Sequence, residues 1–217
     1  MKSAPIAAEA ADTAQIDGKK RRQILDGARR CFLGSGFDAA SMGEIAREAK
    51  VSKGTLYVYF DSKEALFEAL IQEKKRDTAE RMMPLDDTTG PLDETLRDFA
   101  RGLVLALAHP DHVALVRLVI GASERFPQIA RTLFDSGPVH GAARLEAFLR
   151  ERQSRGEVIA GDMNTAAWQF IGMCHHRTMT EAVLGGFPTP TEAEAAARAA
   201  ATVKTFLAAY GTSAARG

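Results

Sequence analysis

A seven-residue segment, residues 53–59, carries side chains that could contact nucleic acid. Leu56 and Phe60 are four residues apart and would share the inward face of a short helix. That spacing leaves four side chains for the outer surface: Lys53, Thr55, Tyr57 and Tyr59. A short helix with small, basic and phenolic side chains on its exposed face fits the major groove of DNA when a second helix braces it at a steep angle. We therefore interpret residues 53–59 as a candidate recognition helix.

The residues around this segment are of the types that begin helices. Ser41 and Glu44 are three positions apart, as in a capping box, and an apolar face at helical spacing accompanies them. Ser52 can cap the recognition helix, and either Asp61 or Ser62 can cap the helix that comes next. The pattern predicts two short helices separated by a tight turn and followed by a third helix.

A longer helix is predicted ahead of these two. Its apolar face is formed by Ile24, Leu25, Ala28, Phe32 and Leu33. Gly34 and Gly36 are expected to end it, and Phe37 is expected to fill the small core behind the recognition helix. These helices together form a helix-turn-helix domain, which we place at residues 18–72. Residues 1–17 are small with few apolar anchors and are expected to form a disordered tail.

The charge is unevenly distributed, although the net charge is zero. Residues 19–63 contain ten Lys and Arg against five Asp and Glu, whereas the chain from residue 64 onward contains seventeen against twenty. A basic head on a mildly acidic body would approach phosphate groups head first. The basic cluster, residues 19–22 (KKRR), could reach a phosphate or a minor groove from the start of the first helix. Each of its members could equally belong to an ordinary solvated charge run.

Residues 51–60 (VSKGTLYVYF) and 62–66 (SKEAL) together resemble the DNA-binding signature of the TetR/AcrR family of transcriptional regulators. The resemblance extends over about residues 21–71. Two residues depart from the family pattern. Lys50 stands where the turn more often has Gly, so a side chain is expected to accept a left-handed backbone there. Gly43 lies inside the first short helix and is expected to weaken it by roughly 1 kcal/mol.

The resemblance also implies which residues touch DNA. Four residues align with the family's base-contacting positions: Lys53, Gly54, Thr55 and Tyr57. Four more align with its phosphate contacts: Ser41, Ser52, Tyr59 and Lys63. To these we add Lys20 and Arg21 of the basic cluster. Lys53 could donate to guanine, and the Thr55 methyl group could meet a thymine methyl group. Half-buried packing is the alternative for Tyr57 and Tyr59.

Residues 73–217 are predicted to form a second domain, also all-α, because no strand pattern exceeds a few residues. A helix over about residues 62–82 would be shared by both domains and could pass a movement between them. Further helices are expected over about residues 92–108, 111–125, 127–134 and 139–155, from Asp162 or Asn164 to Leu184, and over about residues 191–210.

About residues 110–210 resemble the C-terminal domain of AefR-like repressors. The resemblance rests on residues 118–120 (LVI), 124–127 (ERFP), Phe134, 137–138 (GP) and 168–170 (WQF). It implies a site for a small, often apolar or aromatic effector between helices of this domain. Our candidates for that site are Phe99, Leu103, Arg117, Trp168, Met173, Cys174, His175 and Met179. Each of them could instead be plain core.

The last two predicted helices have the composition of a packing interface. Residues 193–201 are all Ala except Glu194 and Arg198, and small side chains let helices approach closely. These two helices also carry larger side chains that would add contact area: Trp168, Phe170, Ile171, Met173, Val203, Phe206, Leu207 and Tyr210. Two copies would make a four-helix bundle, whereas an intrachain core is the alternative. DNA geometry also favours a homodimer, because half-sites of a palindromic operator lie about 34–36 Å apart.

No set of catalytic residues stands out. Pro110 separates His109 from His112, and residues 174–176 (CHH) are adjacent, so they would not face one another on a helix. Metal binding at either place is the alternative to a helix boundary and to a pocket or interface lining. We expect no cofactor and no membrane partner, because no apolar run approaches the length that crosses a bilayer. Two distant cysteines fit a reducing cytoplasm.

The sequence therefore predicts an all-α, two-domain, homodimeric transcriptional regulator of the cytoplasm, most simply a repressor that a small-molecule effector releases from its operator. Two other classes stay open: an architectural DNA-binding protein without an effector, and an all-α enzyme or ligand carrier.

Overall fold

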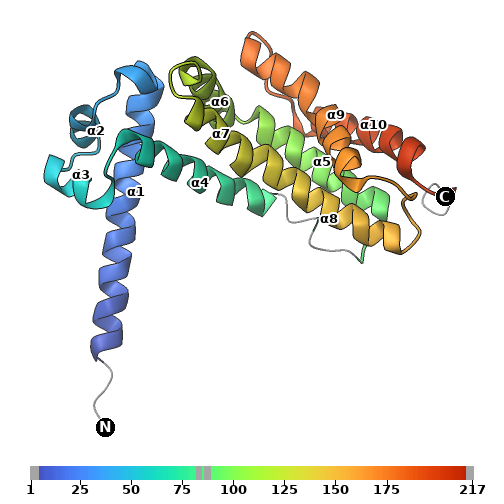
Figure 1. Ribbon diagram of the computed structural model, residues 1–217, viewed down its shortest axis with the longest axis horizontal. Coiled ribbons are helices and arrows are strands. Elements are labelled where there is room, and N and C mark those ends of the chain that lie inside the picture. The colour runs from blue at the N-terminus through green and yellow to red at the C-terminus, as the bar shows by residue number, and fades with distance from the viewer. Residues whose placement is uncertain (1–4, 82–84, 86–88, 214–217) are drawn as a thin grey trace. The chain divides into compact units, whose positions relative to one another are not determined.

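The computed structural model describes the backbone of residues 5–81, 85 and 89–213, and the side chains of residues 17–73, 85 and 89–213. This part of the chain is helical, with one isolated β-bridge between Val158 and Gly211 (Figure 1). The fold is all-α, as the sequence predicts. The chain divides into two compact units, residues 1–72 with 118–130 and residues 73–117 with 131–217.

The first unit contains the helix-turn-helix. Its elements are α1 (Pro5–Ala39), α2 (Met42–Glu48), α3 (Lys53–Tyr59), the start of α4 (Lys63–Arg81), the end of α6 (Pro110–Ala122) and the start of α7 (Pro127–Phe134). Three rings from α1 and α4 meet with centroids 5.3–5.7 Å apart: Phe32, Phe37 and Phe67.

Residues 118–130 belong to the first unit, although the sequence predicts them wholly within the second domain. The edge of the Phe126 ring meets Phe37 at 5.0 Å between centroids, and Arg125 forms an ion pair with Asp38. These contacts join residues distant in sequence, which local patterning does not show.

The second unit is built from α5 (Leu92–Ala108), most of α6, the end of α7, the π-helical segment η2 (Asp135–Val139), α8 (His140–Ser154), α9 (Met163–Leu184) and α10 (Glu192–Tyr210). Helix α10 packs against α5, and α9 packs against α5, α8 and α10. Phe170 lies at the centre, with its ring 6.0 Å from Phe99 and 5.1 Å from Phe206. Ala195 and Ala199 are buried, so α10 can approach its neighbours closely.

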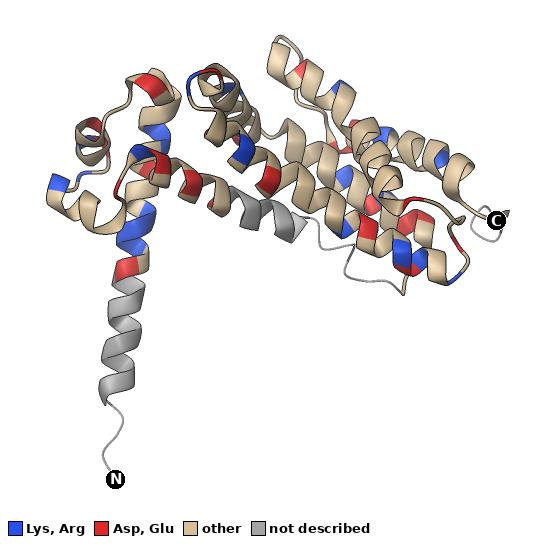
Figure 2. Cartoon of the chain, in the orientation of Figure 1, with Lys and Arg blue, Asp and Glu red and all other residues tan. Residues whose placement is uncertain are grey.

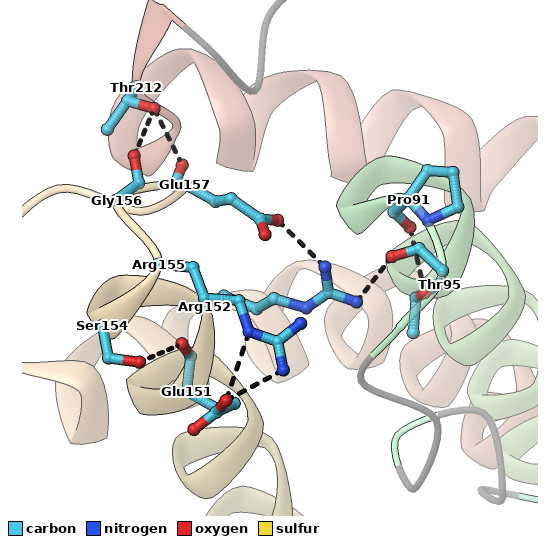
Figure 3. Close-up of polar contacts among 10 residues, drawn as sticks. Pro91, Thr95, Glu151, Arg152, Ser154, Arg155, Gly156, Glu157 and Thr212 are labelled. Carbon is cyan, nitrogen blue, oxygen red and sulfur yellow. Dashed lines mark hydrogen bonds and ion pairs between the residues drawn. The ribbon is translucent and has the colours of Figure 1, made fainter.

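A buried arginine ties the end of α8 to the loop before α5. Arg152 is 2% exposed, and its Nη2 donates to the carbonyl oxygen of Gly90 at 2.7 Å. Its Nη1 forms an ion pair with Glu157 at 2.9 Å (Figure 3). The Thr212 hydroxyl donates to the carbonyl oxygens of Gly156 and Glu157, which holds the same turn from the C-terminal side. Arg152 thus links two separate segments, one through the ion pair with Glu157 and the other through the hydrogen bond to Gly90.

The start of α1 differs from the prediction. The helix begins at Pro5, so the backbone of residues 5–17 is helical where the sequence predicts part of a disordered tail over residues 1–17. Five of these thirteen residues are Ala, which has the highest helix propensity. Residues 1–4 lie outside the described residues.

The end of α1 also differs. The helix runs through Gly34 and is broken only at Gly36, whose φ of 82° is in the left-handed region that glycine tolerates. Leu33, predicted to face the core, is 44% exposed. Phe32 is fully buried, and the next residue is rotated by about 100° around the helix axis.

The other helices follow the sequence closely. Helices α5 and α7 have the predicted bounds, Asp162 caps α9, and α6 ends at Ala122 rather than near residue 125. No single described helix is long and apolar enough to cross a membrane, although α5 and α6 would be if counted together, and they are bent by 61° at their junction.

Most apolar residues predicted for a subunit interface instead lie in the chain's own core. Five of them are buried within the second unit: Phe170, Ile171, Val203, Phe206 and Leu207. The Trp168 ring stacks on Phe134, and the Tyr210 ring stacks on Phe206. Met173 is 38% exposed. The apolar face of α10 is thus turned toward α5 and α9, and the intrachain alternative holds for these residues.

Replacing Arg152 with Ala is expected to lower the free energy of unfolding by about 3 kcal/mol, because Glu157 loses its partner and the part-buried Gly90 carbonyl its donor. Urea denaturation would measure the loss. Arg97→Ala is the matched control, since Arg97 and Asp93 form an exposed pair on one helix, and it should cost less than about 1 kcal/mol. Equal losses in the two variants would contradict the role assigned to Arg152.

Candidate nucleic-acid interface

Side-chain caps fix both short helices. The Ser41 Oγ accepts from the Glu44 N–H at 3.2 Å, and the Glu44 carboxylate accepts from the Ser41 N–H at 3.0 Å, which is the predicted capping box. Its hydrogen bonds with Ser41 lower the pKa of the Glu44 carboxyl. The Ser52 Oγ accepts from the Thr55 N–H at 2.9 Å and so caps α3. Both serines predicted to contact phosphate are therefore already engaged at helix starts.

The turn between α2 and α3 has the left-handed residue that the sequence predicts. Lys50 has a φ of 54°, and it alone among the described non-glycine residues has a positive φ. The turn is closed by hydrogen bonds from Lys50 N–H to Arg47 and from Val51 N–H to Ala46. A lysine therefore occupies a backbone conformation that glycine would adopt without steric cost.

Helix α3 presents one face to solvent. Leu56 is fully buried, whereas Lys53 and Gly54 are exposed and Tyr57 is 51% exposed. Thr55 is half-buried, and its hydroxyl lies 2.8 Å from Ser52 Oγ. Three of the four predicted base-contacting residues therefore lie on an open face, and Thr55 lies at its edge.

Gly43 has a local role that the sequence does not indicate. A Cβ atom at this position would lie 3.1 Å from Lys53 Cε and 3.3 Å from Lys53 Nζ. The Lys53 side chain therefore passes over α2 where Gly43 leaves space. The glycine predicted only to weaken α2 also sets the path of the basic side chain on α3.

Val58 is a residue of this face that the sequence analysis missed. It is 82% exposed, between the two tyrosines of α3. The signal was present, because Val58 follows the buried Leu56 by two positions, about 200° around a helix. The outer face predicted from polar side-chain types does not include this apolar residue.

Lys63 is turned inward. Its Nζ donates to the carbonyl oxygens of Phe37 at 2.9 Å, Asp38 at 3.0 Å and Ala40 at 3.4 Å. It also lies over the Phe37 and Phe126 rings, 4.7 and 5.4 Å from their centroids. The three carbonyls follow the break at Gly36. Lys63, predicted as a phosphate contact, thus holds the connection between α1 and α2.

Tyr59 is hydrogen-bonded to an acidic residue. Its hydroxyl donates to Asp17 Oδ1 at 2.6 Å, and Tyr59 is half-buried. This hydrogen bond raises the pKa of the Tyr59 phenol. The predicted phosphate donor therefore already has a carboxylate acceptor.

The basic cluster, residues 19–22, lies on α1, where Figure 2 shows Lys and Arg in blue. Lys20 donates to Gln23 at 3.0 Å, and Gln23 donates to the Ala49 carbonyl at 2.7 Å, so α1 is joined to the turn after α2. The Arg21 guanidinium lies 5.3 Å from the centre of the Phe60 ring. Lys20 and Arg21 are thus half-buried, next to α3 and its supporting turn.

The structure places the predicted effector residues in different surroundings. Phe99, Leu103, Cys174 and Met179 are buried in the second unit. Trp168 stacks on Phe134, and Met173 and His175 are exposed on α9. Burial raises the pKa of the Cys174 thiol to about 12. His175 has an exposed surface, but partial desolvation by its neighbours and the adjacent His176 lower the pKa of its imidazole.

Arg117 lies at a groove in the second unit. Its Nε and Nη2 donate to the carbonyl oxygens of Val183 (3.1 Å) and Ala182 (2.8 Å) at the end of α9. The groove has a volume of about 300 Å³. Its lining comprises Ala108, Pro110, Val113, Ala114, Arg117, Thr178, Glu181, Ala182 and residues 185–190. Among the described residues, no three His, Cys, Asp or Glu side chains gather in an arrangement that could hold a metal ion.

Two family models match the chain. Residues 24–70 match the model for bacterial regulatory proteins of the tetR family. Residues 94–212, more than half of the chain, match the model for the C-terminal domain of AefR-like transcriptional repressors.

Similar proteins are transcriptional regulators. The HTH-type transcriptional regulator UidR of Escherichia coli (strain K12) is 33% identical over 149 residues, which are 67% of this chain and 72% of UidR. The HTH-type transcriptional repressor Rv1474c of Mycobacterium tuberculosis is 35% identical over 138 residues, 62% of this chain and 67% of that protein.

Two solved structures that resemble this chain are also structures of regulators. The Flavonoid-responsive Regulator FrrA is 37% identical, with a TM-score of 0.80 over 90% of this chain and 99% of FrrA. A TetR-family transcriptional regulator from Mesorhizobium loti MAFF303099 is 30% identical, with a TM-score of 0.79 over 90% of this chain and 98% of that chain.

Lys63→Met is expected to lower the free energy of unfolding by about 1–3 kcal/mol, because it keeps the aliphatic stem but removes the donor of three carbonyl oxygens. Lys53→Met is the control: Lys53 is exposed, and its replacement should change stability by less than about 0.5 kcal/mol. Thermal unfolding followed by circular dichroism would compare them. A Lys63→Met protein as stable as wild type would show that these contacts contribute little.

Asp17→Asn is expected to lower the pKa of Tyr59 toward about 10. The hydrogen bond to Asp17 favours the neutral phenol, so the stability it adds is complete below the unfolded-state pKa and is lost as pH rises through the raised folded-state pKa. Ultraviolet titration of phenolate would resolve one late-titrating tyrosine in the wild type. Tyr59→Phe should remove that late step, and an unchanged curve in Asp17→Asn would refute the assignment.

Proposed function

The chain belongs to the TetR family of bacterial transcriptional regulators, and from that premise we propose that it is a repressor that a small aromatic effector releases from its operator. Its relatives include repressors, and it is a DNA-binding regulator of transcription. The observation that carries the proposal is the open face of α3, on which Lys53, Gly54 and Tyr57 are exposed while Leu56 is buried.

Helix α3 enters the major groove in this proposal. Lys53 and Tyr57 contact base edges, and Gly54 lets the backbone come close. Lys20 and Arg21 supply positive charge for the phosphate backbone at the α1 side of the same unit. Ser41, Ser52, Tyr59 and Lys63 act mainly by holding the helices in position, since each is hydrogen-bonded within the unit. This division separates base reading from positioning.

A homodimer is part of the proposal. One seven-residue recognition helix covers few base pairs, so a palindromic operator needs two copies. The surface of α10 that remains exposed includes Glu192, Glu194, Lys204 and Thr205 together with seven alanines: Ala193, Ala196, Ala197, Ala200, Ala201, Ala208 and Ala209. Small side chains suit close packing of α10 against a second copy, and α9 adds the exposed Met173.

The effector is proposed to bind in the groove beside Arg117. A volume of about 300 Å³ lies at the low end of the range for small-molecule sites. The lining is mostly apolar and includes the polar residues Thr178, Glu181 and Thr189. Together with the adjacent guanidinium it suits a flat aromatic compound with polar substituents. The likeness to a flavonoid-responsive regulator makes flavonoids the first compounds to test.

Release would follow from differential affinity. Arg117 both lines the groove and donates to the last carbonyls of α9, so a ligand there meets a residue that holds a helix end. If the ligand binds more tightly to the conformation that cannot engage both half-sites, the population shifts away from DNA. We place this equilibrium in the cytoplasm, where the operator is accessible.

A footprint on the DNA flanking its own gene would test the whole proposal. The wild-type protein is expected to protect a two-fold symmetric site with half-sites about 34–36 Å apart, and a panel of flavonoids should contain one that removes the protection. Ala114→Phe, which fills the groove, should bind the same site but resist release. Ala143→Phe, at an exposed position of α8, is the matched control and should respond normally.

Different outcomes select different functions. Protection without sequence preference would indicate an architectural DNA-binding protein. No retention on DNA at moderate salt would indicate an all-α enzyme or ligand carrier. Specific protection with equal release of wild type and Ala114→Phe would place the effector outside the groove.

A further inference from the structure

Val58 is an apolar side chain that α3 leaves exposed. At 82% exposure it is the most exposed of the large hydrophobic residues that the structure describes. Exposed valines are not unusual singly. This one lies on the helix that carries the DNA-binding face, next to Tyr57, which is 51% exposed.

Its direction is set by Leu56. Leu56 is fully buried and is the only buried residue of α3, so it fixes the rotation of the helix about its axis. Val58 lies about 200° around the axis from Leu56, and so points away from the core. Gly54, one turn earlier on the same side, has no side chain, and a Cβ atom there would meet nothing nearer than Ser52 Oγ at 3.7 Å. A surface approaching this face would reach the Val58 methyl groups without obstruction.

Thr55 is less suited to present a methyl group at the same face. Its backbone N–H donates to Ser52 Oγ at 2.9 Å, and its hydroxyl lies 2.8 Å from the same atom. It is half-buried in the first turn of α3, where it is hydrogen-bonded to the N-cap residue Ser52. The sequence assigns the thymine-methyl contact to Thr55, whereas the exposure of Val58 favours a different residue.

The chemistry of the major groove restricts what Val58 can read. Of the groups that bases present there, only the C5-methyl group of thymine is apolar. Opposite guanine, adenine or cytosine, a valine would remove water from a donor or acceptor and offer no hydrogen bond in return. We propose that Val58 reads the C5-methyl group of one thymine in each half-site, an inference that rests on the DNA-binding function above.

The test removes that methyl group alone. An operator is first selected from random duplexes with the wild-type protein. Each symmetry-related pair of thymines is then replaced by deoxyuridine, which differs only in lacking the methyl group. Binding of each duplex is measured for wild type, Val58→Ala and Thr55→Ser. Thr55→Ser keeps the hydroxyl at Ser52 and loses the methyl group, so it is matched to Val58→Ala.

One thymine pair is expected to matter to the wild type. Losing one buried methyl contact costs about fourfold in affinity, so the symmetric pair should cost about fifteenfold. Val58→Ala should bind the thymine operator about fifteenfold more weakly and be indifferent to deoxyuridine at that pair. Thr55→Ser should keep the wild-type penalty. Val58→Ala should also unfold at the wild-type temperature, since the side chain is exposed.

Three results would overturn the inference. In the first, no deoxyuridine pair weakens the wild type. In the second, Val58→Ala keeps the full penalty. In the third, Thr55→Ser loses the penalty and Val58→Ala does not, which returns the contact to Thr55. Failure of the selection to enrich any sequence is distinct from these, because it would refute specific DNA binding itself and the Val58 contact with it.

Discussion

The burial of Leu56 is the constraint on which the proposed DNA-binding face depends. A helix of seven residues is too short to be stable alone. Forming its first turn is costly, and so short a helix gains only a few backbone hydrogen bonds afterwards. Helix α3 persists because Ser52 caps its start and Leu56 anchors its middle in the core of the first unit. One buried side chain in so short a helix also fixes its rotation, and the outward direction of Lys53, Tyr57 and Val58 follows from it.

The support beneath α3 uses charged groups internally. At Gly36 the chain leaves the α1 conformation, and the carbonyls of the following residues have no helical partners. The Lys63 ammonium supplies donors to three of them and lies over the Phe37 ring. Phe126, from residues 118–130, closes the same site from the other side. Lys63, which the sequence predicts as a phosphate contact, therefore stabilises the connection between α1 and α2 that supports α3.

In the second unit, α9 and α10 each have one face buried in the chain's own core and another face exposed. Helix α10 buries Val203, Phe206 and Leu207, and exposes alanines on its other side. Helix α9 buries Phe170 and is capped at its end by Arg117, which also lines the groove. The proposed dimer contact lies on α10 and α9, and the proposed effector site is lined by α6 and the end of α9. Helix α9 is therefore the element that would couple them.

The sequence by itself determined most of the helices and pointed to α3 as the candidate recognition helix. Capping residues, helical spacing and glycines act over a few positions. Neighbouring residues were therefore enough to predict the capping box at Ser41, the left-handed Lys50 and the bounds of α5. Only the tertiary structure decided that Lys63 turns inward, that residues 118–130 join the first unit, and that the apolar face of α10 is used within the chain. These outcomes depend on which distant surface buries a given side chain. The sequence gives the chemical type of each side chain, apolar or charged, but tertiary packing decides which residues it contacts.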